Sequence, residues 1–292
     1  MSITSKILCR MFARNDRKRD AGLTTPAEII RYDDIAYGAD ADSQVLDVYR
    51  PREAEGRLPV IISVHGGGWV YGDKELYQHY CMDLARRGFA VINFTYRLAP
   101  RHKYPAQLED TCKVFRWAAD SAEKYGFDME ELFAVGDSAG AHLLALYCIA
   151  CTDESYAANY DFDIPSDLLP KAVALNCGLY EVNKKGFVGD LVGDLMPHKG
   201  TGEELQLISA MRHLSASFPP AYVMTAVKDM MKDDAVKLHA RLDDLGVSNE
   251  FHLYDDRDHS LGHVFHLDIR SEDAQKCNDD ECAFFRRRQQ GR

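Results

Sequence analysis

The 292-residue chain lacks a hydrophobic run long enough to span a bilayer, because no window comes close to the roughly 18 consecutive apolar residues that a membrane helix needs. Its opening stretch, MSITSKILCRMFARNDRKRD, also lacks the apolar core and the small-residue cleavage site of a secretory signal. These absences exclude a membrane-spanning protein. We therefore expect a cytoplasmic protein with no membrane partner.

An excess of positive charge is missing as well. The formal net charge is −11, whereas a nucleic-acid-binding protein needs a basic face that neutralises phosphates. Basic residues do gather near the two ends of the chain, in RMFARNDRKR (Arg10–Arg19) and FFRRRQQGR (284–292). We interpret both clusters as solvated helix faces or tails rather than binding patches. No nucleic-acid partner is expected.

The cysteines lack the spacing of metal ligands. They are Cys9, Cys81, Cys112, Cys148, Cys151, Cys177, Cys277 and Cys282. Cys148 and Cys151 form a C-x-x-C pair, but they lie in the apolar run AHLLALYCIACTD, which predicts a buried helix face. We expect free thiols in a reducing compartment, with no metal and no other cofactor.

Internal repeats, low-complexity segments and long linkers are also absent. Short β-rich apolar runs instead alternate with helical patterns, which predicts a single α/β domain with a mostly parallel central sheet and helices on both faces. The runs IIRYDDIAYG and QVLDVYRP favour an antiparallel pair at one edge of the sheet. The alternation stops between Tyr180 and Phe218, and a stretch of that length (about 180–218) indicates a helical lid insertion.

The sequence VGDSAGAH places Ser138 in a G-x-S-x-G pattern between a predicted strand and a predicted helix. A serine in so tight a turn adopts a strained backbone, and Gly136 and Gly140 leave room around it. The turn presents the hydroxyl at the carboxyl end of the sheet, toward which the next helix directs its positive N-terminus. A structural turn is the alternative, but this context favours a nucleophile.

The sequence HGGGW, which begins at His65, follows a predicted buried strand. Glycines let bare backbone N–H groups approach the negative charge that develops on an oxygen during acyl transfer. We expect Gly66 and Gly67 to be the donors, together with Ala139, which follows the nucleophile. A phosphate-binding loop is disfavoured because neither Gly-Lys-Ser/Thr nor G-x-G-x-x-G is present. His65 is expected to pin the loop by hydrogen bonds.

An acid follows the next predicted strand. In AVKDMMKDD, Asp229 sits where that strand should end. An acid at this position can orient a histidine and stabilise the imidazolium that forms during nucleophilic attack. Asp233 and Asp234 are competing candidates, but they begin a predicted helix, and helix capping is the role expected for them.

These motifs, taken in order, resemble the hormone-sensitive-lipase-like esterases of the α/β-hydrolase fold. The segment YRLAPRHKYPAQLED (Tyr96–Asp110) resembles the family's Y-R-L-A-P-E…F-P-A…D segment. GDSAGA resembles its nucleophile elbow, and DMMKDD resembles its acid motif. The match runs from about Leu46 to the end of the chain. It departs from the family at Arg101, where a glutamate is usual, and at Ala141, where a second glycine is usual.

The resemblance implies a metal-free serine carboxylesterase, often for short acyl chains, with a lid over its pocket. It implies one α/β-hydrolase domain over 1–292, in which residues 1–30 form an N-terminal helical or cap segment. Whether that segment reaches the pocket stays open, since the insertion at 180–218 is also a candidate lid. Apolar residues in and near these loops are the candidate substrate contacts, and those in the insertion are equally candidates for ordinary helix core. They are Trp69, Phe187, Leu191 and Leu195.

Three histidines follow the last predicted strand, in DDRDHSLGHVFHLD. The family's base lies in a His-Gly-Phe motif, and two positions can match it. Distance from the end of the strand favours His259, whereas the local pattern GHVF favours His263. Flanking apolar residues hold His263 and exclude water, while His259 lies in a polar loop whose charges can keep it protonated. We therefore expect His263 to be the base and His266 to pack or face solvent.

The predicted function is hydrolysis of small, short-acyl carboxylic esters through a Ser-His-Asp triad and an acyl-enzyme intermediate. A small-molecule ester is the expected partner, and a homodimer is a candidate assembly. A sugar or xenobiotic deacetylase, or a peptidase, can use the same triad. A ligand-binding receptor on an inactive hydrolase scaffold is an alternative from a different class.

Overall fold

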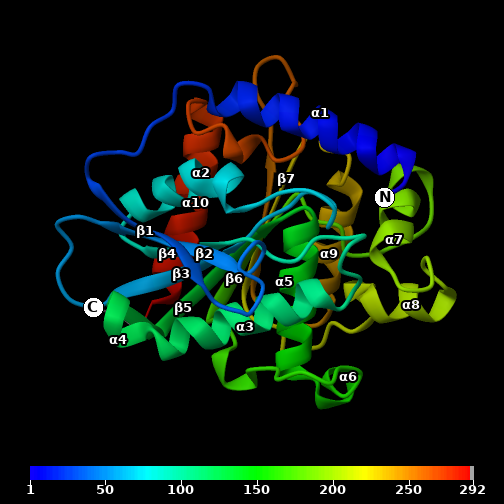
Figure 1. Ribbon diagram of the computed structural model, residues 1–292. Coiled ribbons are helices and arrows are strands. Elements are labelled where there is room, and N and C mark those ends of the chain that lie inside the picture. The colour runs from blue at the N-terminus through cyan, green and yellow to red at the C-terminus, as the bar shows by residue number, and fades with distance from the viewer. Residues whose placement is uncertain (290–292) are drawn as a thin grey trace.

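The computed structural model describes residues 1–289 and shows an eight-stranded sheet with helices on both faces (Figure 1). The spatial order of the strands is β1-β2-β4-β3-β5-β6-β7-β8. Their bounds are β1 Ile29–Ala36, β2 Val45–Pro51, β3 Leu58–Val64, β4 Ala90–Phe94, β5 Phe127–Asp137, β6 Ala172–Asn176, β7 Ala221–Ala226 and β8 Asn249–Tyr254. The antiparallel edge is confirmed, since β2 pairs antiparallel with both β1 and β4. The remaining neighbours are parallel, as predicted.

The helices divide between the two faces of the sheet. Their bounds are α1 Ile3–Asp20, α2 Lys74–Arg86, α3 Ala106–Asp120, α4 Ala122–Tyr125, α5 Ala139–Thr152, α6 Glu154–Ala157, α7 Gly186–Leu195, α8 Gly202–Ile208, α9 Lys232–Asp244 and α10 Glu272–Arg288, with 3-10 turns η1 Ser166–Leu168, η2 Ala210–Arg212 and η3 Phe265–Leu267. Helices α3, α5 and α9 pack in one hydrophobic core, and α2 and α10 pack in the other.

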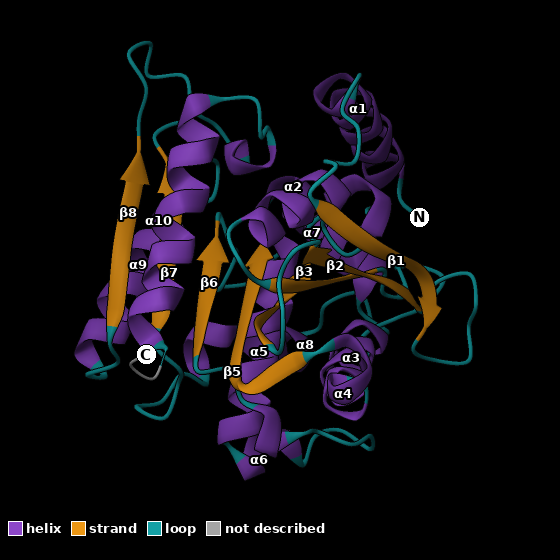
Figure 2. Ribbon diagram, turned by 90° about the vertical axis from the view of Figure 1, so that its left-hand side faces the viewer, coloured by secondary structure: helices purple, strands orange, loops and turns teal. Residues whose placement is uncertain are grey.

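The central strands are buried on both faces, which explains their nearly unbroken apolar sequences. In β3, Val60 and Ile62 belong to one core and Ile61 belongs to the other, as the two-residue period of a strand requires. Figure 2 shows β6, β7 and β8 pointing toward the same edge of the sheet. Loops that follow parallel strands therefore gather at one edge, where ligands bind in this kind of architecture.

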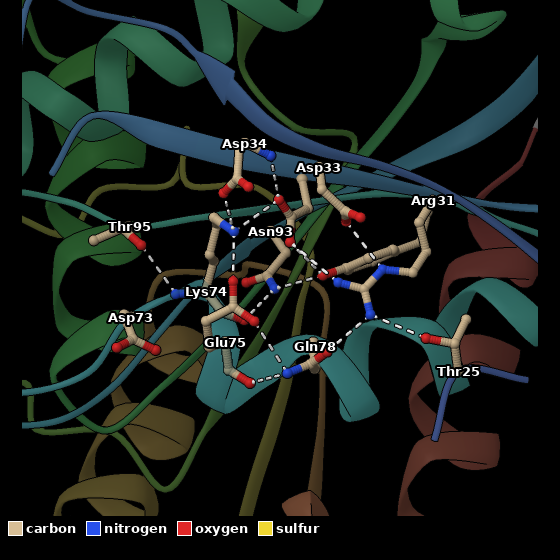
Figure 3. Close-up of polar contacts among 12 residues, drawn as sticks. Thr25, Arg31, Asp33, Asp34, Asp73, Lys74, Glu75, Gln78, Asn93 and Thr95 are labelled. Carbon is tan, nitrogen blue, oxygen red and sulfur yellow. Dashed lines mark hydrogen bonds and ion pairs between the residues drawn. The ribbon is translucent and has the colours of Figure 1, made fainter. Parts of the chain in front are cut away.

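An ion cluster around the buried side chains of Lys74 and Asp47 ties the edge strands to α2 (Figure 3). The Nζ atom of Lys74 lies 3.0 Å from Asp47 Oδ1, 2.9 Å from Asp34 Oδ1 and 2.6 Å from Glu75 Oε1. Burial alone would lower the pKa of Lys74, but the hydrogen bonds to these carboxylates raise it. The cluster anchors the first turn of α2, the helix that follows the glycine-rich loop at His65.

Two segments outside the alternating pattern lie together at one side of the molecule. Helix α1 runs across the top of Figure 1 and contacts α7, which belongs to the predicted lid insertion. Backbone N–H of Ser2 donates to both carboxylate oxygens of Asp194, at 3.0 and 2.8 Å, which joins the start of α1 to the end of α7.

Three features that the sequence analysis discussed can be located in the fold: the cysteines, the lack of a membrane-spanning helix and the basic clusters. All eight cysteines carry free thiols. Within residues 1–289, no helix combines the length and the apolarity that crossing a bilayer requires. Of the two basic clusters, the first lies within α1 and the second begins in the last turns of α10; residues 290–292 lie outside the described part of the chain.

Candidate active site

Ser138 occupies a sharp turn between β5 and α5. Its backbone has φ 51° and ψ −117°, a strained conformation for a residue with a side chain. The flanking glycines are required sterically, because a Cβ atom on Gly140 would lie 2.0 Å from the carbonyl oxygen of Val64 and one on Gly136 would lie 2.7 Å from Gly140 backbone. Ser138 N–H donates to Asn176 O at 2.9 Å, which ties the turn to β6.

The structure brings Ser138, His263 and Asp229 together from three distant parts of the chain. His263 Nε2 lies 3.0 Å from Ser138 Oγ, and His263 Nδ1 lies 2.7 Å from Asp229 Oδ1. In this arrangement the imidazole can accept the serine proton on one nitrogen while its other nitrogen donates to the carboxylate. The three side chains line one cavity or lie directly behind it.

Asp229 is held as an anion by its hydrogen bonds. Its side chain is buried, and burial alone would raise its pKa. The bond from His263 and the bonds from Met231 N–H at 2.9 Å and Thr225 Oγ1 at 2.7 Å outweigh burial and lower the pKa of Asp229 to about 2. An ionised carboxylate at this position can stabilise a protonated imidazole.

The loop that carries His263 is fastened beside the end of β7. Lys228 N–H donates to Leu261 O at 2.9 Å, and Lys228 pairs with Gly262 in an isolated bridge. The next residue, Val264, has a positive φ of 53° and starts the turn into η3. Asp229 directly follows Lys228, and His263 directly follows Gly262. This bridge therefore places the carboxylate and the imidazole side by side.

The other two histidines of this loop do not reach Ser138. His259 is 73% exposed, and its Nδ1 lies 2.5 Å from Asp255 Oδ2. His266 is fully buried and packs edge-on against Tyr80, with ring centroids 5.1 Å apart. Burial lowers the pKa of His266 to about 3, so this imidazole stays neutral. Of the two positions that the sequence offered for the base, the structure places His263 beside the serine.

In the glycine-rich loop, the structure contradicts one of the backbone N–H groups predicted to bind the substrate oxygen. Gly66 N–H donates to the Tyr77 hydroxyl at 2.9 Å, so the prediction that it faces a substrate oxygen is wrong. Within residues 1–289, the N–H groups of Gly67, Gly68 and Ala139 have no hydrogen-bond acceptor. Gly67 and Gly68 have φ of 107° and 61°, and all three residues line the cavity that contains Ser138. The free backbone donors are therefore shifted by one residue from the predicted pair.

His65 lies under this loop rather than in the cavity. Its Nδ1 lies 2.7 Å from Gly66 O, and its ring stacks on Tyr96 at 3.9 Å between centroids. Burial lowers the pKa of His65 to about 4, which keeps the ring neutral and able to donate to the carbonyl. This geometry fits the loop-pinning role expected from the sequence.

The cavity over Ser138 has a volume of about 560 Å³, within the range of small-molecule sites. Three of the four predicted substrate contacts, Trp69, Phe187 and Leu191, line it. The prediction for Leu195 is wrong. This residue ends α7, is fully buried in the core, and its carbonyl accepts from Tyr104 N–H at 3.0 Å. One helical turn separates it from the part of α7 that reaches the cavity.

Helix α1 also lines the cavity, which the sequence left open. Its inner face contributes an apolar part, including Leu8 and Phe12, and a polar part around Asp16 and Arg19. Arg19 Nη1 lies 3.1 Å from Asp16 Oδ1, and the hydroxyl of Tyr71 donates to Asp16 Oδ2 at 2.8 Å. The cavity is thus closed by α1 on one side and by α7 on another.

Neither competing acid takes the place of Asp229, which is the acid that pairs with His263 Nδ1 at 2.7 Å. Asp233 and Asp234 fall in the first turn of α9, whose N-cap is Met231, so the prediction that they cap the helix is wrong. Their negative charge still suits the first turn of a helix, where the backbone N–H groups are unpaired. Burial raises the pKa of Asp234 to about 6.

A group of three side chains has the composition of a metal site but not its chemistry. The ligand atoms of Cys177, Asp229 and His263 all lie within 4.8 Å of one another. Both ring nitrogens of His263 already have partners, since Nδ1 lies 2.7 Å from Asp229 Oδ1 and Nε2 lies 3.0 Å from Ser138 Oγ. Burial also holds the pKa of the Cys177 thiol well above its usual value, which disfavours the thiolate that binds metals. These residues therefore fit a proton-transfer pair better than a metal centre.

Two buried carboxyl groups behind the site were missed by sequence reasoning. Asp137 Oδ2 accepts from the Tyr77 hydroxyl at 2.8 Å, and burial raises the pKa of Asp137 to about 7. On the other side of the turn, Glu281 accepts from Asn176 Nδ2 at 2.6 Å and from Tyr80 at 2.8 Å. Of these two residues, only Asp137 lies in a recognisable motif, GDSAG, and no local pattern marks Glu281.

Comparisons with known proteins fit this geometry. The sequence model of a family described as alpha/beta hydrolase fold matches residues 61–263. Versiconal hemiacetal acetate esterase of Dothistroma septosporum is 27% identical over 238 residues, which cover 76% of this chain and 71% of that protein. Carboxylesterase NlhH of Mycobacterium tuberculosis is 26% identical over 247 residues, which cover 80% and 77%. The crystal structure of esterase B from Lactobacillus rhamnosis is similar with a TM-score of 0.86 and 25% identity, covering 97% of this chain and 93% of that chain.

Proposed function

Because this chain belongs to the α/β-hydrolase-fold family and is one of its hormone-sensitive-lipase-like carboxylic ester hydrolases, we propose that it cleaves small, short-acyl esters through a covalent intermediate on Ser138. The observation that carries the proposal is the continuous hydrogen-bond path from Ser138 Oγ through His263 to Asp229, at 3.0 and 2.7 Å.

In the proposed reaction, His263 Nε2 takes the proton of Ser138 as the serine oxygen attacks the ester carbonyl carbon. Asp229 holds the imidazole in the required orientation and stabilises its positive charge. The tetrahedral intermediate then collapses, and His263 returns the proton to the departing alcohol. Water, activated by the same imidazole, hydrolyses the acyl-enzyme and restores Ser138.

We assign the negative oxygen of the tetrahedral intermediate to the N–H groups of Gly67, Gly68 and Ala139. They are free among the described residues, and they line the cavity together with Ser138. The Gly66 N–H supports them indirectly, because its bond to Tyr77 fixes the start of the loop. Fixed donors of this kind stabilise a developing oxyanion without reorganising during the reaction.

A short acyl group is supported by crowding beside these donors. The side chain of Leu191 approaches within 2.9 Å of where a Cβ atom on Gly68 would lie, so α7 closes directly over the glycine loop. Trp69, which is 1% exposed, forms another rigid wall. The relative from Dothistroma septosporum is named as an acetate esterase, which favours the short acyl class.

Labelling with a fluorophosphonate probe tests the proposal, since such a probe reacts only with an activated serine. We expect the wild-type chain to be labelled at Ser138 and to hydrolyse p-nitrophenyl acetate, and we expect the Ser138→Ala variant to do neither. Labelling without ester hydrolysis would redirect the assignment to a deacetylase or peptidase. A chain that is not labelled would be a binding protein on a hydrolase scaffold.

A further inference from the structure

The outer face of α1 is both basic and apolar. We define this face as the exposed residues on the side of the helix turned away from the protein, which recur at three- and four-residue spacings. They are Ile3, Lys6, Ile7, Arg10, Met11, Arg14, Arg17 and Lys18. Ile3 is 78% exposed and Ile7 is 59% exposed. Isolated apolar side chains on a surface are ordinary, but an apolar stripe among five cations on one helix is not.

The acidic residues of α1 do not neutralise this face. Asp16 and Asp20 are only partly exposed and pair with Arg19, which lies on the inner side of the helix at the cavity. The charges of α1 are therefore segregated, with cations outside and ion pairs inside. The whole chain carries −11, so this face is positive on an acidic molecule.

The outer face of α1 continues into the mouth of the cavity. Met11 belongs to both, since it is 47% exposed and also lines the cavity. Two further exposed apolar residues, Phe187 and Met230, line the same cavity from α7 and from the loop after β7. Figure 1 shows α1 at the edge of the molecule, outside the sheet and its covering helices. A surface that touched this helix would meet the entrance to Ser138.

We propose that the outer face of α1 docks on anionic phospholipid surfaces and takes up ester substrates that partition there. A helix with cations and exposed isoleucines on one side has the composition that lies in the headgroup plane, with apolar side chains inserted and basic ones facing lipid phosphates. A nucleic acid would satisfy the cations but would leave the isoleucines in water. The expectation of no membrane partner rested on the missing membrane-spanning run and secretory signal, and neither of these bears on docking at a membrane surface. The net negative charge of the chain does not oppose docking either, because screening over about 8 Å makes the local charge decisive.

Sedimentation with vesicles tests this proposal. The protein is mixed with phosphatidylcholine vesicles that contain about 30 mol% phosphatidylglycerol, or none, at low and at high salt. The charge-reversal variant is Lys6→Glu, Arg10→Glu and Arg14→Glu, and a second variant is Ile3→Ser with Ile7→Ser. None of these residues lines the cavity. The matched control reverses three exposed cations elsewhere, by Arg57→Glu, Arg101→Glu and Lys124→Glu.

We expect wild type to bind the anionic vesicles and to be released by salt. Since each basic residue near an anionic surface contributes about five-fold to partitioning, the charge-reversal variant should lose about 100-fold or more. The isoleucine variant should lose about ten-fold, and the control should stay within about two-fold. Hydrolysis of soluble p-nitrophenyl acetate should not change in any of them.

The proposal is overturned if wild type does not bind anionic vesicles or binds neutral ones equally well. It is also overturned if the charge-reversal variant binds like wild type, or if the control loses as much as that variant does. The same sedimentation is carried out with Ser138→Ala, which should bind vesicles like wild type. Docking and catalysis are therefore tested separately, because vesicle binding does not depend on whether the chain is an esterase.

Discussion

Tyr77 connects the glycine-rich loop to the nucleophile turn, because its hydroxyl donates to Asp137 Oδ2 at 2.8 Å and accepts from Gly66 N–H at 2.9 Å. The two partners belong to different elements, and each adjoins a group proposed to act on the substrate. Gly66 precedes the free N–H groups of Gly67 and Gly68, and Asp137 precedes Ser138. One buried hydroxyl thus fixes the distance between the proposed oxyanion donors and the proposed nucleophile.

Replacing Tyr77 with Phe should weaken both stability and turnover. The ring still fills its place in the core, but Gly66 N–H and the Asp137 carboxyl lose their partner, which costs about 1–3 kcal/mol in the free energy of unfolding. Loosening of the loop should lower kcat about ten-fold with little change in KM, because the donors matter most in the transition state. Tyr80→Phe is the control, since it removes a buried hydroxyl from the same helix that bonds Glu281 instead. Equal kcat for the two variants would contradict the positioning role of Tyr77.

Replacing Leu191 with Ala should shift acyl preference toward longer chains. The truncation opens space beside Gly68, so the ratio of octanoate to acetate hydrolysis should rise by about ten-fold or more. Leu195→Ala is a matched control, because Leu195 is a buried leucine of the same helix that does not line the cavity. Both variants should lose about 2–5 kcal/mol of stability. If both variants changed acyl preference, the cause would be the lower stability of α7 and not the space that Leu191 occupies in the cavity.

The buried carboxyl of Glu281 should make stability fall as pH rises. Burial raises the pKa of Glu281 to about 7 from its usual 4.5, so between these values the folded state binds more protons than the unfolded state. The stabilisation linked to this group is therefore complete below about pH 4.5 and is lost as pH passes through 7. The change is about 3 kcal/mol. Urea unfolding of wild type and Glu281→Gln from pH 4.5 to 8 should show that wild type loses about this much more stability than the variant, because Asp137 and Asp234 have raised pKa values in both proteins.

Other groups titrate in the same pH range, so the test depends on the difference in unfolding free energy between wild type and Glu281→Gln at each pH. His65 and His142 have pKa values lowered to about 4 by burial, which makes stability rise with pH in both proteins. Subtracting the two curves cancels these shared contributions. The exposed Glu272, also on α10, provides the control through Glu272→Gln. Parallel curves for wild type and Glu281→Gln would show that Glu281 does not titrate as its burial requires.

The sequence predicted the parts of the site whose signal is local. Ser138 and its flanking glycines form one short motif, and the apolar runs before HGGGW and GDSAG identified the strands that end there. The fold could be predicted from the alternation of such runs with amphipathic helices. A β strand that is buried on both faces has a nearly continuous apolar sequence, which is easy to recognise.

The sequence did not reveal relationships that only folding creates. Adjacent glycine N–H groups look identical in HGGGW, and the choice between Gly66 and Gly68 depends on the hydroxyl of Tyr77, which lies in the next helix. The bond between Asn176 and Glu281 joins residues 105 positions apart. Leu195 followed the apolar pattern of α7 as Leu191 did, but the end of that helix turns into the core.

The central claim is that His263 transfers the proton of Ser138, and hydrolysis of p-nitrophenyl butyrate by two histidine variants tests it most directly. His263→Ala should lower kcat/KM by about three orders of magnitude or more, because it removes the group 3.0 Å from the serine oxygen. His259→Ala, which changes an exposed histidine of the same loop, should keep nearly the full rate. A His263→Ala enzyme that retains most of its activity would contradict the account.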